Sequence, residues 1–299
     1  MAIIKGTSGS DRIVGTNGDD VIYGYGGDDD LIGGAGYNDY FGGRGADWFI
    51  MSTRKAGVFS DDYIHDFTFG EDKVDVSAWG VSEFEQIRAL LRTDANGDAI
   101  LNAFYGGSDH VLTIEGVSPG ELIASDFVYS GGGARDMTGT SRADVLFGSA
   151  FGDIIRGGDG ADILLGGAGN DRILGGAGND DIFGGTGRDT LTGGGGSDAF
   201  VFTTLADSRP GSNRDVITDF QLDRDFIDLR DIDANVFAGG DQSFAWRGSA
   251  GFTGHAGELR YSFSGGNTIV SADVDGDRSA DFQIQLTGLY DLKSYDFVL

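Results

Sequence analysis

The chain has 299 residues, with 54 Gly, 2 Pro and no Cys, and its 48 acidic residues against 21 Lys and Arg give a net charge of -27 at pH 7. This excess of negative charge disfavours nucleic acid and anionic membrane surfaces as partners and favours cations. Disulfides and thiolate chemistry are excluded, and no segment approaches the roughly 18 apolar residues of a membrane span.

The N-terminal region consists of nine-residue blocks. Five blocks run from Gly6 to Ile50. Their sixth positions are Asp11, Asp20, Asp29, Asn38 and Asp47, and their eighth positions are Ile13, Ile22, Leu31, Tyr40 and Phe49. Glycines permit tight turns through left-handed backbone angles, and the residues around each eighth position predict a short strand. The repeat therefore predicts a parallel coil of alternating strands and turns.

Ordinary mixed sequence follows the first array, over residues 51–130. It contains one clear helix signal, SEFEQIRALLR from Ser82, with Ser82 and Glu85 spaced as a capping box. An apolar stripe, Phe84, Ile87, Leu90 and Leu91, predicts packing on a core, and an interaction helix is the alternative. We expect this segment to be a β-rich cap that covers the last turn of the coil.

A second array of seven blocks runs from Gly139 to Val201. Its sixth positions are Asp144, Asp153, Asp162, Asp171, Asp180, Asp189 and Asp198, and its eighth positions are Leu146, Ile155, Leu164, Ile173, Ile182, Leu191 and Phe200. Asn38 in the first array, and Arg142 and Phe151 at fourth positions here, depart from the pattern. Such regularity across seven blocks predicts a second coil.

The segment that follows the second array, its sequel, resembles the segment that follows the first. Two segments align without a gap: DYIHDFTFGEDKVDV from Asp62 and DVITDFQLDRDFIDL from Asp215. Near the ends of the two sequels, SDFVY from Ser125 resembles YDFVL from Tyr295. The chain is therefore predicted to be a tandem duplication: first roll 1–50, first cap 51–130, second roll 131–202 and second cap 203–299. The predicted class is all-β, with two parallel rolls and β-rich caps.

Stacked turns bring the sixth-position carboxylates into files that repel one another unless a cation binds between them. Carboxylates and glycine carbonyls supply the six to eight oxygens that calcium prefers. Magnesium demands a tighter octahedron, and zinc prefers the His and Cys that these blocks lack. Calcium is the best fit.

These blocks resemble the GGxGxDxUx nonapeptide of the RTX family, secreted bacterial proteins whose repeats form a calcium-loaded parallel β-roll. The resemblance implies an ion between each turn and the turn two blocks later. The first turn gives its Asp and the carbonyls at positions two and four, and the later turn gives its Asp and the carbonyls at positions one and three. Pairing the blocks in this way implies about eight ions.

The resemblance assigns metal ligands in both arrays. In the first they are Thr7, Gly9, Asp11, Thr16, Gly18, Asp20, Gly24, Gly26, Gly27, Asp29, Gly33, Ala35, Asn38, Gly42, Arg44 and Asp47. In the second they are Asp144, Asp153, Gly157, Gly158, Asp159, Gly160, Asp162, Gly166, Gly167, Ala168, Gly169, Asp171, Gly175, Gly176, Ala177, Gly178, Asp180, Gly184, Thr186, Asp189, Gly193, Gly195 and Asp198.

The second cap resembles the C-terminal domain of the serralysin proteases. Its DVDGDRSAD, from Asp273 to Asp281, has part of the spacing of a calcium loop, and a plain acidic hairpin is the alternative. In the resembling family an ending such as Asp296–Leu299 belongs to an uncleaved signal read by a type I ABC exporter, whereas a buried last strand is the other explanation. The resemblance implies a secreted protein, unfolded in the calcium-poor cytosol and located outside the cell or at its surface.

The sequence has no sign of catalysis. Its histidines, His65, His110 and His255, lie far apart, and neither an HExxH helix nor a Gly-x-Ser-x-Gly elbow is present. We therefore expect a non-enzymatic calcium-binding protein that acts in a matrix, in adhesion or in host interaction. One alternative is a polysaccharide-binding accessory module, with Trp48, Trp79 and Trp246 stacking on sugars, and a less favoured one is a small hydrolase.

Overall fold

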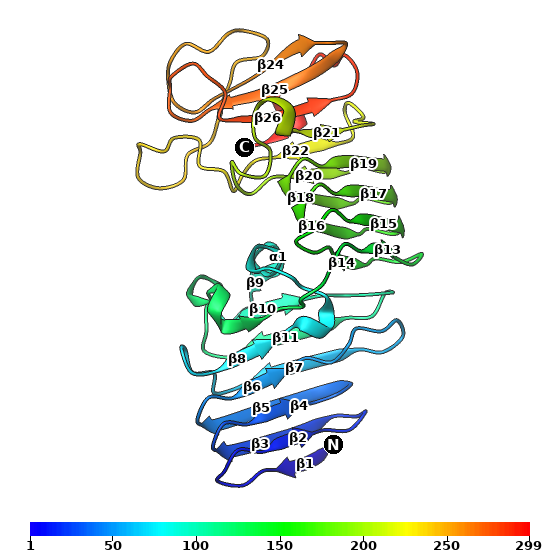
Figure 1. The fold of residues 1–299 in the computed structure, drawn as a ribbon, viewed down its shortest axis with the longest axis vertical. Helices are drawn as coiled ribbons and strands as arrows, with labels where there is room; N and C mark the ends of the chain where they lie inside the picture. The colour runs from blue at the N-terminus through cyan, green and yellow to red at the C-terminus, as the bar shows by residue number, and fades with distance from the viewer. The chain divides into compact units, whose positions relative to one another are not determined.

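The computed structural model describes all residues from 1 to 299 (Figure 1). They form two compact units, the first made of Met1–Gly132 with Ala143–Phe147 and the second of Gly133–Arg142 with Gly148–Leu299. The predicted all-β class is confirmed, because the regular structure is 27 strands, five short 3₁₀ helices and one α-helix. None of the helices has the length and apolar character needed to cross a membrane.

Two sheets make up the first unit. One has the order β1 (Ala2–Lys5), β3 (Asp20–Gly26), β5 (Gly36–Arg44), β7 (Ser60–Ile64), β11 (His110–Ile114), β10 (Ala99–Asn102) and β9 (Leu91–Thr93). The other has the order β12 (Phe127–Val128), β8 (Lys73–Asp75), β6 (Trp48–Ile50), β4 (Asp30–Ile32) and β2 (Arg12–Val14). Pairing is parallel from β1 through β11 and antiparallel only at β10 and β9. The array and its sequel therefore share continuous sheets.

The second unit repeats this plan. Its longer sheet has the order β13 (Asp136–Thr138), β15 (Ile154–Asp159), β17 (Arg172–Ala177), β19 (Thr190–Gly195), β21 (Asp215–Ile217), β26 (Phe282–Leu286), β25 (Asn267–Asp273), β24 (Glu258–Ser264) and β23 (Ala245–Trp246). Facing it are β16 (Ile163–Gly169), β18 (Asp181–Gly187), β20 (Ala199–Val201), β22 (Phe226–Asp228) and β27 (Phe297–Val298). Figure 1 shows β13, β15, β17 and β19 stacked in chain order, as a coil requires.

The strand register explains why the repeating block has nine residues. Ile155 pairs with Ile173, and Ile173 pairs with Leu191, so each strand meets the strand 18 residues later. Two blocks therefore make one full coil, with one strand in each sheet. The eighth-position side chains fill the space between the sheets, and those of Ile22, Leu31, Ile155 and Leu164 have no exposed surface. Burial of this apolar row stabilises each coil against the next.

The helix α1 (Phe84–Leu90) lies in the sequel of the first array, as predicted, but the predicted capping box is wrong. Glu85 does not reach back to the start of the helix; instead the buried Gln86 side chain accepts hydrogen bonds from the backbone N–H and hydroxyl of Ser82. Ile87 and Leu90 are buried, which supports core packing. The 3₁₀ helices are η1 (Ser77–Trp79), η2 (Pro119–Glu121), η3 (Ala124–Asp126), η4 (Gly211–Asn213) and η5 (Ser294–Asp296).

A partly buried arginine, Arg54, ties Ala143–Phe147, which includes β14 (Val145–Phe147), to the rest of the first unit. The Arg54 guanidinium donates to the carbonyl oxygens of Val145 and Trp79 and lies 4.8 Å from the centre of the Phe147 ring. Burial lowers the pKa of Arg54 to about 10, so it stays charged at neutral pH.

The coil predicts which glycines are replaceable. Gly178 has φ +142°, and a Cβ there would overlap the carbonyl oxygen of Gly160 in the preceding coil, whereas a Cβ on Gly195 would meet nothing within 4 Å. We expect Gly178→Ala to lower the free energy of unfolding by at least about 2 kcal/mol, because strain and overlap add. Gly195→Ala is the matched control. Urea titration in saturating calcium measures both, and equal losses would contradict the stacked-turn geometry.

Candidate metal centre

The sixth-position aspartates form buried files along the turns. In each file the backbone N–H of one aspartate donates to Oδ1 of the aspartate 18 residues later. The N···O distances are 2.9 Å from Asp162 to Asp180, 3.0 Å from Asp180 to Asp198, and 2.9 Å from Asp29 to Asp47. Each carboxylate is thus fixed by the turn before it, and one of its two oxygens is occupied.

In five aspartates of the files the second carboxylate oxygen has no hydrogen-bond donor. The Oδ2 atoms of Asp29, Asp47, Asp180, Asp189 and Asp198 are buried and accept no hydrogen bond, and the residues are at most 1% exposed. A buried charged oxygen without a partner is costly, so such atoms are rare unless an ion compensates them. Oxygen-only surroundings with no His or Cys fit a hard cation such as calcium.

Backbone carbonyls converge on the same points. A Cβ placed on Gly175 would lie against both Asp180 Oδ2 and the carbonyl oxygen of Gly193, which opens the block two later. The same holds at Gly24 for Asp29 Oδ2 and the carbonyl oxygen of Gly42. Glycine at the first position therefore keeps open a pocket that carboxylate and carbonyl oxygens share.

Some of the predicted ligands lie together in the structure, and one of them already accepts a hydrogen bond. It brings Asp162, Asp180 and the carbonyl of Gly175 together, whereas the carbonyl oxygen of Ala177 already accepts a bond of 2.7 Å from the N–H of Gly160. That oxygen keeps one free lone pair for an ion.

The departure at Asn38 changes the chemistry of its turn. Asn38 Nδ2 donates to Asp62 Oδ1 at 2.8 Å, and the hydroxyl of Tyr40 lies beside it and accepts the N–H of Gly33. The neutral amide of Asn38 thus stands at the sixth position, where the other blocks have an aspartate. Asp144, by contrast, accepts the N–H of Gly106 within the first unit.

Several acids of the caps continue the files, and our sequence analysis missed them as site residues. The N–H of Asp189 donates to Asp215 Oδ1 at 2.8 Å, and that of Asp198 to Asp225 Oδ1 at 3.1 Å. Asp47 donates likewise to Asp72 at 2.9 Å. The signal that could have found them is the alignment of the two sequels, where acids recur at the same places, although the spacing is no longer 18 residues.

Burial shifts the pKa values of these carboxyls upward. It raises the pKa of Asp47 and of Asp198 to about 6, and nearby carboxylates add to the shift. The pKa values of Asp189 and Asp215 are raised too, by burial first and for Asp215 by the charge of Asp189 next. Without a cation the folded state therefore holds these groups more readily as neutral acids.

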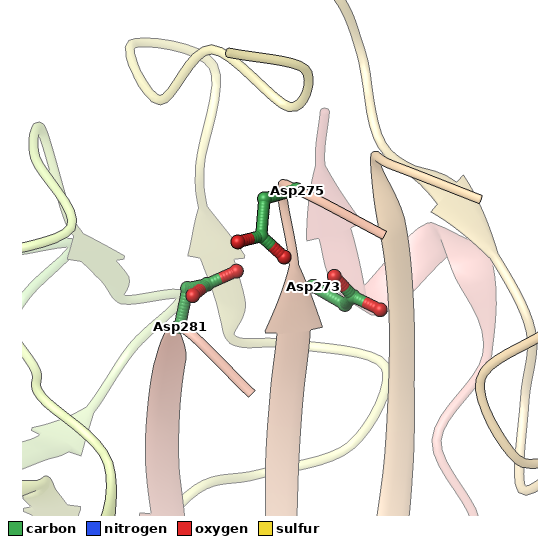
Figure 2. A group of neighbouring side chains, drawn as sticks. All are labelled: Asp273, Asp275 and Asp281. Atoms are coloured by element: carbon green, nitrogen blue, oxygen red, sulfur yellow. The ribbon is translucent and has the colours of Figure 1, made fainter. Parts of the chain in front are cut away.

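Asp273, Asp275 and Asp281 gather at the turn between β25 and β26 (Figure 2), with carboxylate oxygens within 4.8 Å of one another. Their hydrogen bonds support the turn itself. Asp273 accepts the N–H groups of Gly276 at 2.7 Å and Arg278 at 2.9 Å, and Asp281 accepts that of Val274 at 2.9 Å. Of the two explanations for this segment, the acidic hairpin accounts for these contacts.

Two protein-family models match the chain. The model described as "Peptidase M10 serralysin C terminal" matches residues 94–299, which are 206 of the 299 residues. The model described as "RTX calcium-binding nonapeptide repeat (4 copies)" matches residues 5–40. No curated protein matches the chain.

Solved structures with some similarity include two subunits of the mannuronan C5-epimerase of Azotobacter vinelandii. AlgE6R3 is 27% identical with a TM-score of 0.30, covering 56% of this chain and 78% of that one. AlgE6R2 is 29% identical with a TM-score of 0.29, covering 54% and 91%. The extracellular lipase LipA of Serratia marcescens is 19% identical with a TM-score of 0.34, covering 98% of this chain and 39% of the lipase.

The raised pKa values predict a pH dependence of the calcium-free protein. A carboxyl whose folded pKa exceeds its unfolded value of about 3.9 stabilises the fold fully below that value, and this contribution is lost as the pH rises through the folded pKa. With folded values of about 6 for Asp47 and Asp198, calcium-free protein should have more β signal in circular dichroism at pH 5 than at pH 8.

Asp198→Asn is the control, because an amide cannot titrate and should reduce this difference. With saturating calcium the trend should reverse, since protons compete with the ion. A calcium-free β signal that grows with pH would contradict the assignment.

Proposed function

The chain belongs to the peptidase M10 serralysin C-terminal family, and on that premise we propose that it is a secreted, non-enzymatic calcium-binding RTX protein whose rolls fold when extracellular calcium binds. The observation that carries this proposal is the file of buried Oδ2 atoms without a hydrogen bond, at Asp29, Asp47, Asp180, Asp189 and Asp198. Bound calcium compensates the negative charge of these carboxylate oxygens.

The charge of the chain supports a folding switch. Without calcium, burial of several negative carboxylates opposes folding, so a chain with net charge -27 is expected to stay extended at low calcium. Outside the cell the same carboxylates become ligands, and binding free energy becomes folding free energy. About eight ions, as the repeat implies, would offset more than half of the net charge.

The C-terminal segment supports export of an unfolded chain through a type I exporter. In the folded unit, Phe297 and Val298 form β27 beside β22, and Asp296 is 1% exposed while its carboxylate accepts the N–H of Lys293. A receptor for this segment therefore requires the chain before it folds. The internal counterpart at Phe127–Val128 forms β12 in the same way, which gives the segment a structural role as well.

Binding rather than catalysis suits the histidines. His110 Nε2 accepts the N–H of Lys55, so the ring proton lies on Nδ1 and is donated to the Ser60 hydroxyl at 3.2 Å. The imidazole in this arrangement cannot take the serine proton. His65 lies between Glu115, at 2.6 Å, and Asp39, at 2.8 Å, which together raise its pKa against the effect of burial.

The tryptophans offer limited support for sugar stacking. Trp79 is 2% exposed and donates to the carbonyl of Ser52, and Trp246 stacks on Tyr261. Only Trp48, 39% exposed, presents a large part of its ring to solvent. A role in a matrix, in adhesion or in host interaction at or outside the bacterial surface therefore takes precedence over the polysaccharide-binding module.

In this proposal each roll and its cap form one folding module, 1–50 with 51–130 and 131–202 with 203–299. The continuous sheets that run from β5 to β7 and from β19 to β21 support this pairing. The cap covers an edge that would otherwise leave backbone groups unpaired.

Calcium titration of metal-free protein at pH 7.5, followed by far-ultraviolet circular dichroism, tests the proposal. We expect a cooperative coil-to-β transition at roughly 0.1 to 1 mM calcium and none with magnesium. A chain that is fully folded without calcium and unchanged by it would refute the folding switch.

Asp180→Asn provides the specific test of the files. Loss of one buried carboxylate should raise the calcium midpoint at least about threefold, because a charged ligand is replaced by a neutral one. The matched control, Asp159→Asn, removes the same charge from an exposed side chain of the preceding coil but keeps the backbone carbonyl that the repeat assigns as a ligand, so it should leave the midpoint nearly unchanged. Equal shifts would indicate an effect of net charge alone.

A further inference from the structure

The turns of the two rolls are of two kinds, and residue type at the second position of the block separates them. Blocks in the middle of each roll, and at its cap end, have glycine or another residue in the left-handed region there, for example Gly176 at φ +120° and Tyr25 at φ +76°. The starting blocks have Thr or Ser there, and neither these residues nor Gly9 and Gly18 adopt positive φ.

Thr7 and Thr16 saturate the aspartates of their own blocks. The N–H and hydroxyl of Thr7 both donate to Asp11 Oδ2, at 2.6 and 2.8 Å. Those of Thr16 donate to Asp20 Oδ2 at 2.5 and 2.9 Å. Two neutral donors therefore stand at the oxygen that accepts no hydrogen bond in Asp29, Asp180 and Asp189.

The second roll starts in the same way. Ser149 donates from its N–H to Asp153 Oδ2 and from its hydroxyl to Asp153 Oδ1 at 3.1 Å. The hydroxyl also accepts the N–H of Phe151 at 3.2 Å, and that of Thr140 accepts the N–H of Arg142 at 3.2 Å. These hydroxyl turns need no left-handed residue at the fourth position, which explains why Arg142 and Phe151 replace glycine there.

The files close again at the caps. Asp72 Oδ2 accepts the N–H of Thr68 at 2.8 Å, and Asp225 Oδ2 accepts that of Gln221 at 2.8 Å, while their Oδ1 atoms accept from the preceding turn. Asp215 and its counterpart in the first cap, Asp62, differ, since the Oδ2 atom of each is buried and accepts no hydrogen bond. The cap of the second roll therefore contains one aspartate of the open kind.

We propose that Asp11, Asp20 and Asp153 bind no calcium because Thr7, Thr16 and Ser149 take its place, and that the calcium-binding file of the second roll extends into the cap to Asp215. This rests on the proposed function. The ligand set that the repeat implies is thereby displaced from the starting blocks toward the caps.

The arrangement gives each roll a start that forms without calcium. A hydroxyl-closed turn has its carboxylate satisfied by local donors only four residues away, so it forms from a short segment. Open turns then add onto it as ions bind, as in a repeat protein that grows by nearest-neighbour contacts.

The test is the number of calcium ions per chain, measured by mass spectrometry of the metal after gel filtration of calcium-saturated full-length protein. Asp215→Asn should bind about one ion fewer than the unaltered chain. Asp153→Asn, equally buried but of the closed kind, should bind the same number as the unaltered chain. Loss of an ion from Asp153→Asn as from Asp215→Asn would overturn the proposal.

A gain of binding gives the second arm. Thr7→Gly removes the donor hydroxyl and allows the left-handed turn, so it should bind about one ion more than the unaltered chain. Thr7→Val removes the hydroxyl without allowing that turn and should gain none. If Asp153→Asn does not fold, this pair decides, and a folded Thr7→Gly without an additional ion overturns the proposal.

The calcium titration of the unaltered chain distinguishes failure of the proposed function from failure of the closed-turn and open-turn assignment. If that chain does not fold with calcium, the proposed function fails. If it folds but the variants do not sort into closed and open kinds, only the present inference fails.

Discussion

The structure depends on one hydrogen bond repeated along each file, from the N–H of one aspartate to the Oδ1 of the aspartate in the next coil. Distances of 2.7 to 3.1 Å recur from Asp153 to Asp171, from Asp162 to Asp180 and from Asp198 to Asp225. This bond fixes the coil spacing and draws every carboxylate inside. It also brings negative charges together where water cannot screen them, and this is the physical basis of the proposed dependence of the fold on a cation.

The apolar row and the glycines serve this constraint. Residues such as Leu164 and Ile182 fill the space between the sheets, so the coils stack at a fixed register. Glycines at first positions leave room for the carboxylate. Many glycines at second and fourth positions have positive φ and turn the chain within a few residues. Hydrophobic burial thus sets the stack, while the turns concentrate oxygen atoms along its edges.

The caps are continuations of the rolls as well as covers. β21 pairs with β19 in the same parallel sheet, and Asp215 follows Asp189 in the same file. Asp66 and Asp219 illustrate the transition: Asp219 accepts the N–H groups of Gly193 and Gly194, and Asp66 those of Gly42 and Gly43. The two sequels share these acids because each must satisfy the last turn of a coil.

Much of this protein was predictable from sequence because its order is periodic. The nine-residue period predicted the parallel coils, the strands around the eighth positions and the files of acids, since each strand pairs with the strand 18 residues later. Departures from period needed the tertiary structure. Ser82, just before α1, donates to Gln86 rather than pairing with Glu85, and the alternative turns at Thr7 and Ser149 depend on donors that no spacing rule distinguishes. Asp215 joins its file across 26 residues, because only the folded chain decides which segment follows the last coil.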